Sequence, residues 1–271
     1  MFTLHKQGRL TYLQLVWPGA VAVFTARGGG VSQGPYSSLN LGLNVEDDAE
    51  AVIANRERAA AIIGKPLSQF TACRQVHGKE VAVVGGRQLG CGVYDLETAL
   101  PGCDGLLTQE PGALFAFFAD CVPIWLYDPV QKAGGVIHAG WRGTMAGIVP
   151  EAVRKLKRRF GSEPADLYAA VGPSIGPCCY QVGEDVVRAA EKLARTKGLQ
   201  AASFFPQQEP GKWRADLPGF NRALLLSEGL KPERISSSGL CSSCHSSLFF
   251  SHRRDAGKTG RMAAIFCLTG R

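Results

Sequence analysis

Short runs of hydrophobic residues along the chain predict a mixture of strands and helices. Runs rich in β-branched and aromatic residues predict buried strands at 20–25, 114–119, 122–127, 133–138, 167–171 and 263–268, and a further apolar run covers 81–84. Apolar residues at helical spacing predict helices at 49–63, 150–160 and 184–195. Pro150 fits the first turn of its helix, where a backbone N–H has no partner inside the helix, so we expect a short turn or kink at 144–149.

The order of these elements indicates the fold class. Strands and helices are mixed without regular βαβ repetition, which indicates an α+β protein. A turn at Asp128-Pro129 would join two of the strands into a hairpin and bring Cys121 near His138. With 271 residues, 45% of them hydrophobic, the chain can bury a large core. It shows no linker and no repeat, so we expect one domain over residues 1–271.

The charge balance is basic, with a formal net charge of +7 at pH 7. A surface of that sign favours anionic partners such as phosphate or nucleotides. The densest basic run, at 154–159, contains no aromatic residue, and no nucleic-acid module signature accompanies it. We therefore expect a solvated helix face there and no nucleic-acid partner.

The cysteines and the absence of long apolar runs indicate a compartment. Nine cysteines are an odd number, and a chain of this size does not need disulfide bonds to fold, so a reduced cytosolic protein is the simpler interpretation. The stretch 12–26 could imitate a signal-peptide core, but Gln14 and Pro18 interrupt it. No apolar run approaches the roughly 20 residues of a membrane span. We expect a cytoplasmic protein that does not bind membranes.

Three residues in short glycine- or alanine-containing segments form the strongest candidate site. His77 stands in RQVHG, Cys121 in ADCVP and His138 in HAGWRGT. Two imidazoles and one thiolate suit Zn²⁺, and three protein ligands leave a fourth position for water or substrate, as in catalytic zinc sites. Zinc lowers the pKa of a bound water molecule from about 15.7 to about 7, which would provide a nucleophile at neutral pH.

These three segments belong to an ordered set of motifs that extends almost from end to end. The others are FTARGGGVS at 24–32, SLNLG at 38–42, NR at 55–56, GPSIGPCCY at 172–180, FSHRRD at 250–255 and TGR at 259–261. In this order they resemble the family once labelled multicopper polyphenol oxidases and now described as zinc-dependent purine nucleoside phosphorylases. Three departures are visible, and none removes a proposed zinc ligand: 44–46 reads NVE instead of a His-x-Gly-like sequence, His252 stands where Tyr is common, and Pro150 interrupts the stretch after His138.

The resemblance implies both a fold and an activity. It sharpens the α+β prediction to a layered α/β/β/α sandwich with mixed sheets. It implies one catalytic zinc ion held by His77, Cys121 and His138. The implied reactions are phosphorolysis of adenosine, inosine, guanosine and S-methyl-5′-thioadenosine, and deamination of adenosine, so purine nucleosides and phosphate would be the partners.

Phosphorolysis also needs groups that bind phosphate. Arg142, four residues after His138, is the first candidate, because a guanidinium meets phosphate oxygens through two parallel hydrogen bonds. Arg56, Arg27 and Arg254 are weaker candidates for the same role. For Arg142 the alternative is a structural ion pair with a carboxylate.

Two aspartates are candidates for proton transfer or for orienting a ligand. Asp120 adjoins Cys121 and could orient a histidine, carry a proton or contact substrate. Asp104 in GCDG is placed similarly. A structural hydrogen bond is the alternative role for each.

The segment Cys241-Ser242-Ser243-Cys244-His245 matches the pattern of covalent haem attachment. We reject that interpretation, because attachment normally follows export and no export signal is present. A second zinc site from Cys241, Cys244 and His245 stays open, although no second cysteine pair at finger-like spacing supplies the remaining ligands. We expect Cys178-Cys179 to contribute packing rather than redox chemistry.

Other functions compete with the nucleoside hypothesis. Some relatives are linked to editing wrong amino acids from peptidoglycan precursors, which a zinc hydrolase with the same ligands could perform. Cys121 could instead be a nucleophile with His138 as its base. A multicopper oxidase does not fit this composition, because it needs many histidine ligands and the chain has five histidines. A zinc-stabilised binding protein without catalytic activity is the alternative from a different class.

Overall fold

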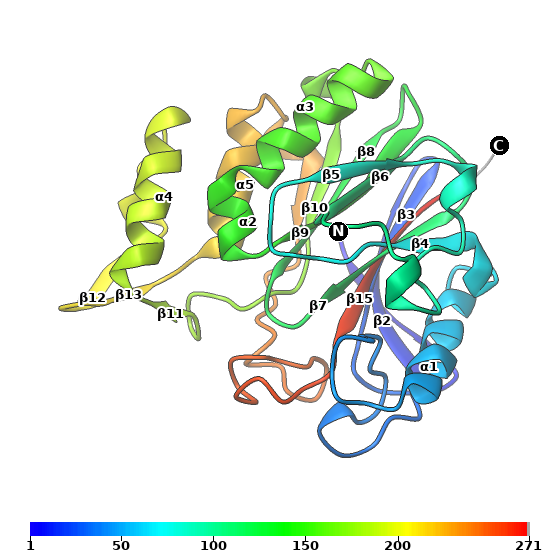
Figure 1. Cartoon of the computed structure of the whole chain (residues 1–271). Coiled ribbons are helices and arrows are strands. Elements are labelled where there is room, and N and C mark those ends of the chain that lie inside the picture. The colour runs from blue at the N-terminus through cyan, green and yellow to red at the C-terminus, as the bar shows by residue number, and fades with distance from the viewer. Residues whose placement is uncertain (270–271) are drawn as a thin grey trace.

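Two six-stranded sheets lie face to face and helices cover both outer surfaces in the computed structural model, which describes residues 1–269 (Figure 1). The first sheet has the order β1-β2-β3-β15-β7-β4. Its strands are β1 (Thr3–Gln7), β2 (Leu10–Trp17), β3 (Ala20–Thr25), β15 (Met262–Leu268), β7 (Ala113–Phe118) and β4 (Phe70–Ala72). Neighbours are antiparallel except β7 and β4, which run parallel.

The second sheet has the order β14-β10-β8-β9-β6-β5 and carries a parallel pair at each edge. Its strands are β14 (Ile235–Ser237), β10 (Tyr168–Val171), β8 (Val122–Asp128), β9 (Ala133–Ala139), β6 (Gly105–Thr108) and β5 (Val81–Val84). A small three-stranded sheet combines β11 (Gln181–Val182), β13 (Lys212–Arg214) and β12 (Gln207–Glu209). Single 3₁₀ turns lie at Gly34–Tyr36, Leu67–Gln69, Gly86–Gln88, Leu96–Thr98, Pro164–Asp166, Ala201–Ser203 and Pro232–Arg234.

Helices close the two outer faces of the sandwich. The second sheet is covered by α3 (Ile148–Phe160) and α5 (Leu217–Ser227), and α1 (Ala49–Ala61) packs on the first sheet (Figure 1). The helix α4 (Glu184–Thr196) lies farther out and packs against the small sheet. A core rich in aromatic side chains, including Phe24, Phe118 and Trp125, fills the space between the sheets. The predicted α/β/β/α sandwich with mixed sheets is therefore confirmed.

The strands predicted from the apolar runs are present, and the helices agree closely. The predicted turn or kink at 144–149 lies at Gly147, but the short helix α2 (Trp141–Ala146) before it was not predicted, and α3 already begins at Ile148. Gly147 between them has a φ of 89°, a left-handed conformation that glycine adopts without strain. Pro150 still lies in the first turn of α3, where its missing N–H costs no hydrogen bond.

The β8–β9 hairpin turns at Asp128, as predicted, and it sets up the candidate site at its open end. Pro123 pairs with His138 across the hairpin, and Cys121 directly precedes β8. The basic run at 154–159 lies on α3, whose buried side is formed by residues such as Ala152 and Leu156. None of the helices among residues 1–269 combines the length and the apolar character that crossing a membrane requires.

Candidate active site

Asp104 and His138 form a buried pair beside the end of the β8–β9 hairpin. Asp104 directly precedes β6, and its carboxylate Oδ1 lies 2.8 Å from His138 Nδ1. The two residues are 1% and 3% exposed. A carboxylate is an acceptor, so His138 donates its Nδ1–H, and Nε2 is the nitrogen that can bind a ligand once it has released its proton.

The same carboxylate also shapes the loop that carries His77. Backbone N–H groups of Val76 and Gly78 donate to Asp104 Oδ2 at 3.2 and 2.7 Å, and the N–H of His77 donates to Oδ1 at 2.9 Å. His77 itself has a φ of 59°, a conformation that is uncommon for a residue with a side chain. Three N–H donors converging on one buried carboxylate hold this strained turn in place.

His77, Cys121 and His138 converge as the sequence predicts. Their ligand atoms lie within 4.8 Å of one another. Gly140 keeps the space beside them open, since a methyl group at this position would lie 2.9 Å from Cys121 Sγ and 3.0 Å from His77 Nδ1. Two imidazoles and a thiol around a gap fit a borderline-soft metal ion with three protein ligands.

The charges of these groups are strongly coupled. Burial by itself would raise the pKa of the Cys121 thiol, but His138 and His77 outweigh it and lower that pKa to about 6. Burial would likewise lower the pKa of His138, but the Cys121 thiolate and the Asp104 carboxylate raise it to about 9. Asp104 has a lowered pKa, because the contacts to His138 and to backbone N–H groups outweigh its burial. At neutral pH the cluster holds a thiolate, the form that binds a metal ion.

The lowered thiol pKa predicts a distinctive pH profile for metal-free protein. Alkylation of Cys121 by iodoacetamide should reach half of its maximal rate near pH 6 and be almost constant above pH 7, because only the thiolate reacts. The alkylation rate of a free peptide thiol should instead reach half of its maximum near the thiol pKa of about 8.5. Mass spectrometry of the Cys121 peptide across pH measures the profile. A Cys121 profile that follows the free peptide would contradict the stabilisation of the Cys121 thiolate by His138 and His77.

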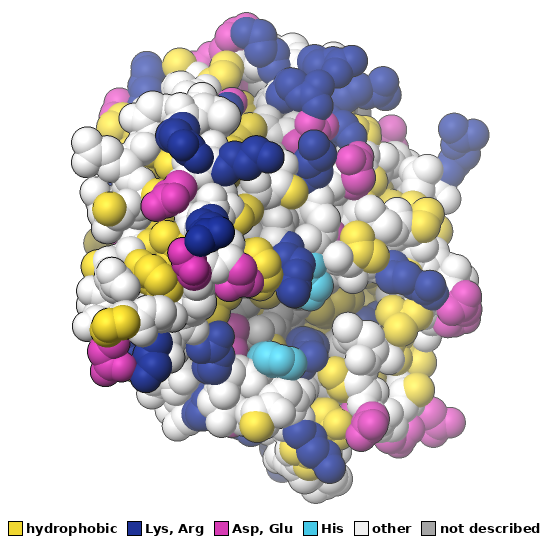
Figure 2. All heavy atoms as spheres, turned by 60° about the vertical axis from the view of Figure 1, so that its left-hand side comes forward, with side chains coloured by type: hydrophobic (Ala, Val, Ile, Leu, Met, Phe, Trp, Pro, Cys, Tyr) yellow, Lys and Arg dark blue, Asp and Glu magenta, His cyan; other side chains and the backbone are white. Residues whose placement is uncertain are grey.

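A cavity of about 560 Å³ opens over the three ligand candidates. The face in Figure 2 is hollowed near its centre, and histidine and basic side chains gather around the hollow. The lining contains five arginines and a single carboxylate, that of Asp120. The arginines are Arg56, Arg74, Arg142, Arg253 and Arg261. A cavity of this size with such a lining suits a small anionic ligand, or a neutral one bound together with an anion.

The arginines differ in how far they are already bound by the protein. The Arg142 guanidinium lies 4.5 Å from the centre of the Trp141 ring, and no hydrogen bond to it is found among residues 1–269. Arg56 is completely buried and donates to the carbonyls of Leu41, Gly92 and Val93. In the described part of the chain its Nη2 has no hydrogen-bond partner. Burial lowers the pKa of Arg56 to about 9.

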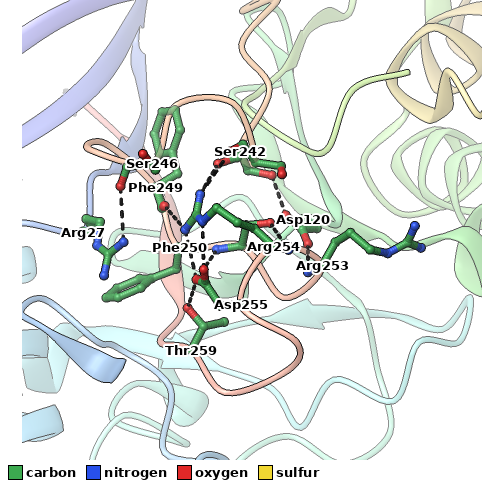
Figure 3. Close-up of polar contacts among 12 residues, drawn as sticks. Arg27, Asp120, Ser242, Ser246, Phe249, Phe250, Arg253, Arg254, Asp255 and Thr259 are labelled. Carbon is green, nitrogen blue, oxygen red and sulfur yellow. Dashed lines mark hydrogen bonds and ion pairs between the residues drawn. The ribbon is translucent and has the colours of Figure 1, made fainter. Parts of the chain in front are cut away.

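Two of the predicted anion-binding arginines are not among the cavity-lining residues. Arg27 donates to the carbonyls of Ser37 and Ser246 and stacks over Phe250 (Figure 3). Arg254 forms a two-pronged ion pair with Asp255 at 2.8 and 2.9 Å. Both guanidinium groups hold neighbouring loops together through these contacts.

Asp120 does not take the role of orienting a histidine, which belongs to Asp104. Its Oδ1 accepts from Ser242 Oγ at 2.6 Å and its Oδ2 accepts from the N–H of Arg253 at 2.7 Å (Figure 3). Its carbonyl accepts from the N–H of Ile175. The residue has a φ of 84° and is 8% exposed. Asp120 lines the cavity, but both of its carboxylate oxygens hold neighbouring loops.

Several lining residues did not emerge as candidates from the sequence. The guanidinium carbon of Arg253 lies 5.0 Å from the centre of the Tyr180 ring. The same guanidinium donates to the carbonyl of Gln181. His252 and Arg261 line the same cavity. All four stand inside the motifs at 172–180, 250–255 and 259–261, and this was the feature of the sequence that could have identified them. Burial is the main reason that the pKa of Tyr180 rises to about 12, which keeps its hydroxyl protonated at neutral pH.

Known proteins are similar to this chain in sequence and fold over most of their length. Residues 21–269 match the model of the family described as multi-copper polyphenol oxidoreductase laccase. A protein named purine nucleoside phosphorylase YlmD from Geobacillus stearothermophilus is 45% identical over 248 residues, covering 91% of this chain and 89% of that protein. A protein named adenosine deaminase RL5, from an unknown prokaryotic organism, is 36% identical over 244 residues, covering 90% of this chain and 92% of that protein. The crystal structure of YlmD from Geobacillus stearothermophilus has a TM-score of 0.92 at 41% identity, covering 98% of this chain and 99% of that chain.

Proposed function

The chain belongs to the multi-copper polyphenol oxidoreductase laccase family, and within that family we propose that it is a zinc-dependent purine nucleoside phosphorylase that also deaminates adenosine. The proposed substrates are adenosine, inosine, guanosine and S-methyl-5′-thioadenosine, with phosphate as the co-substrate. The relatives named purine nucleoside phosphorylase and adenosine deaminase support an enzyme that acts on purine nucleosides. The observation that carries the proposal is the cluster of His77, Cys121 and His138 inside an arginine-rich cavity.

The donor set supports zinc as the metal. His77, Cys121 and His138 would hold one ion, and two nitrogens with one thiolate match the ligands that zinc prefers in catalytic sites. When bound, zinc supplies a Lewis acid that polarises substrate and lowers the pKa of water. The described residues place no group of three or more ligands with more than two histidines, so several coppers with histidine shells have no matching donors there.

The remaining residues of the cavity supply anion binding and orientation. Arg142 can bind phosphate through two parallel hydrogen bonds. Arg56 can donate a further hydrogen bond from its Nη2, which has no partner in the described part of the chain. Asp104 fixes the tautomer and the ring orientation of His138. The protonated Tyr180 hydroxyl can donate a hydrogen bond to a purine or to the sugar. Holding phosphate and nucleoside together in one enclosed geometry lowers the barrier to their reaction.

The proposal is tested by product analysis. Zinc-loaded protein is incubated with inosine and phosphate, and hypoxanthine and ribose 1-phosphate are separated by chromatography. We expect both products in equal amounts, and neither product when phosphate is omitted. Adenosine without phosphate should give inosine, because hydrolytic deamination needs only water. Zinc-loaded protein that converts neither nucleoside would refute the proposal.

Arg142→Lys should impair the use of phosphate selectively. Lysine keeps the positive charge but lacks the planar fork, so one hydrogen bond to a charged group is lost. Such a bond contributes about 1.5–3 kcal/mol, so KM for phosphate should rise roughly 10- to 100-fold. KM for inosine and the rate of adenosine deamination should change little. Steady-state kinetics with each substrate varied in turn measures the difference.

Arg74→Lys is the matched control, because Arg74 lines the same cavity but pairs with the exposed Glu97 at 2.8 Å. An exposed ion pair contributes little, so this variant should keep both KM values near those of the parent protein. Equal increases in the KM values of phosphate and inosine in Arg142→Lys would indicate a general structural role instead.

A further inference from the structure

Four cysteines outside the candidate active site converge on one point of the surface. Cys178 and Cys179 lie in the loop between β10 and β11, and Cys241 and Cys244 lie in the loop after β14. The four sulfur atoms lie within 4.8 Å of one another. Cys244 Sγ lies 3.5 Å from Cys178 Sγ and 3.4 Å from Cys179 Sγ, and all four are free thiols.

We propose that Cys178, Cys179, Cys241 and Cys244 form a second metal site, a structural tetrathiolate centre that binds one zinc ion. Four sulfurs at zinc–sulfur distances of about 2.3 Å from a tetrahedral centre are separated by about 3.8 Å, close to the contacts seen here. A closed set of four thiolates leaves no position for water or substrate, which distinguishes a structural from a catalytic zinc site.

The surroundings of the cluster favour a bound cation over four neutral thiols. The N–H of Gly176 donates to Cys241 Sγ at 3.3 Å, as backbone groups around metal-bound thiolates do. The guanidinium of Arg214 donates to the carbonyl of Cys178 and helps to hold this loop. Cys178 and Cys244 are exposed, and exposed free thiols are reactive unless a metal occupies them.

His245 is not a member of this ligand set. Its Nδ1 lies 2.9 Å from the carbonyl of Cys241, and its ring packs against Phe249. The second zinc site that the sequence left open from Cys241, Cys244 and His245 therefore takes a different form. The adjacent residues Cys178 and Cys179 supply the remaining two ligands, although adjacent cysteines do not have the spacing that is typical of zinc-finger ligands.

The position of the cluster gives the metal a role in shaping the cavity. It joins the loop that continues into Tyr180 to the loop that leads to Arg253, and both of these residues line the cavity. The two loops also meet elsewhere: Ser174 forms an isolated β-bridge with Cys241, with backbone hydrogen bonds to Leu240 and Ser242. Arg253 stacks on Tyr180 and donates to the carbonyl of Gln181. A zinc ion there would fix the distance between the two sides of the substrate cavity, without itself contacting substrate.

The metal content of purified full-length protein tests this site. We expect two zinc ions per chain by elemental analysis and native mass spectrometry. Cys121→Ser should retain one of them, and X-ray absorption at the zinc edge of this variant should show four sulfur neighbours at about 2.3 Å. Because Cys121→Ser removes no residue of the cluster, this readout does not depend on whether cluster variants fold.

Variants of the cluster provide the reciprocal result. Cys244→Ser, which changes an exposed residue, should retain one zinc ion with mixed nitrogen and sulfur neighbours and should lower Tm. His245→Ala should keep both ions. Disulfide bonds among the four cysteines in protein freshly purified under reducing conditions would overturn the proposal, as would iron in place of zinc or a nitrogen neighbour in Cys121→Ser. None of these readouts requires nucleoside turnover, so they stand apart from the proposed activity.

Discussion

Cys121→Ser is expected to lose the active-site zinc ion and, with it, both phosphorolysis and deamination. A serine hydroxyl stays protonated at neutral pH and is a poor zinc ligand, whereas the Cys121 pKa of about 6 makes its thiolate available. A metal ion contributes several kcal/mol to stabilising transition-state charge, so kcat/KM for both reactions should fall by at least roughly 10²- to 10³-fold. Elemental analysis and coupled assays of the two reactions measure the loss.

Cys91→Ser serves as the matched control, because Cys91 is a partly buried free cysteine outside both groups of metal ligands. It should keep the full zinc content and both activities. His77→Ala distinguishes zinc catalysis from a thiol nucleophile: a dyad of Cys121 and His138 would survive it, but a metal site that needs three ligands would not. Full zinc occupancy in Cys121→Ser would remove this residue from the ligand set and favour the nucleophile.

Several long strands could be predicted from the sequence because they are buried on both faces, whereas the short buried strands β4 and β6 were not predicted. β3, β8 and β9 are continuous apolar runs because helices or the opposite sheet cover each side of them. β1 is exposed at most of its positions, so it lacks an apolar run that could mark it. The helix α5 begins with Leu217-Pro218 and was not predicted, although Asp216 caps it by accepting the N–H of Gly219.

The three members of the metal-ligand cluster could be predicted because each stands in a recognisable motif, but which of the two candidate aspartates pairs with His138 could not. Asp120 is adjacent to Cys121 in the sequence, yet both lie in the bend between β7 and β8, where Asp120 has a left-handed φ of 84°. Its carboxylate therefore faces Ser242 and the backbone of Arg253. Asp104 reaches His138 because β6 pairs with β9, a contact that only the sheet topology determines.

The four-cysteine cluster shows the same limit over a longer range. Cys179 and Cys244 are 65 positions apart, and no periodic pattern relates them. Their meeting depends on the parallel pairing of β10 with β14, which places the loops that follow these strands at the same edge of the sheet. Arg27 shows that a conspicuous motif does not guarantee a place in the site. It stands in a glycine-rich motif, yet its guanidinium contacts the carbonyls of Ser37 and Ser246 and does not line the cavity.

Asp104→Asn should weaken zinc binding at the active site although it removes no ligand. The change replaces one carboxylate oxygen by an NH₂ group, and both oxygens of Asp104 accept only from N–H donors. If the NH₂ faces His138, the imidazole must move its proton to Nε2, which can then no longer bind a metal. If the NH₂ faces Val76 and Gly78, the turn that holds His77 loses its anchor. Loss of such a supporting contact costs about 10- to 100-fold in metal affinity or activity, and we expect the upper end here because two ligands depend on one carboxylate.

Competition with a chelator of known affinity measures the zinc dissociation constant of Asp104→Asn, and inosine phosphorolysis at saturating zinc measures the activity. The matched control is Asp128→Asn, another buried aspartate, which lies at the opposite end of the β8–β9 hairpin. Only its Oδ1 accepts from N–H groups, those of Val130 and Gln131, and its Oδ2 has no partner in the described part of the chain, so an NH₂ group can take that place. Asp128→Asn should retain zinc affinity and activity. Equal losses in both variants would mean that buried carboxylates stabilise this fold in general, and unchanged zinc affinity in Asp104→Asn would show that His138 does not need Asp104 to present its nitrogen.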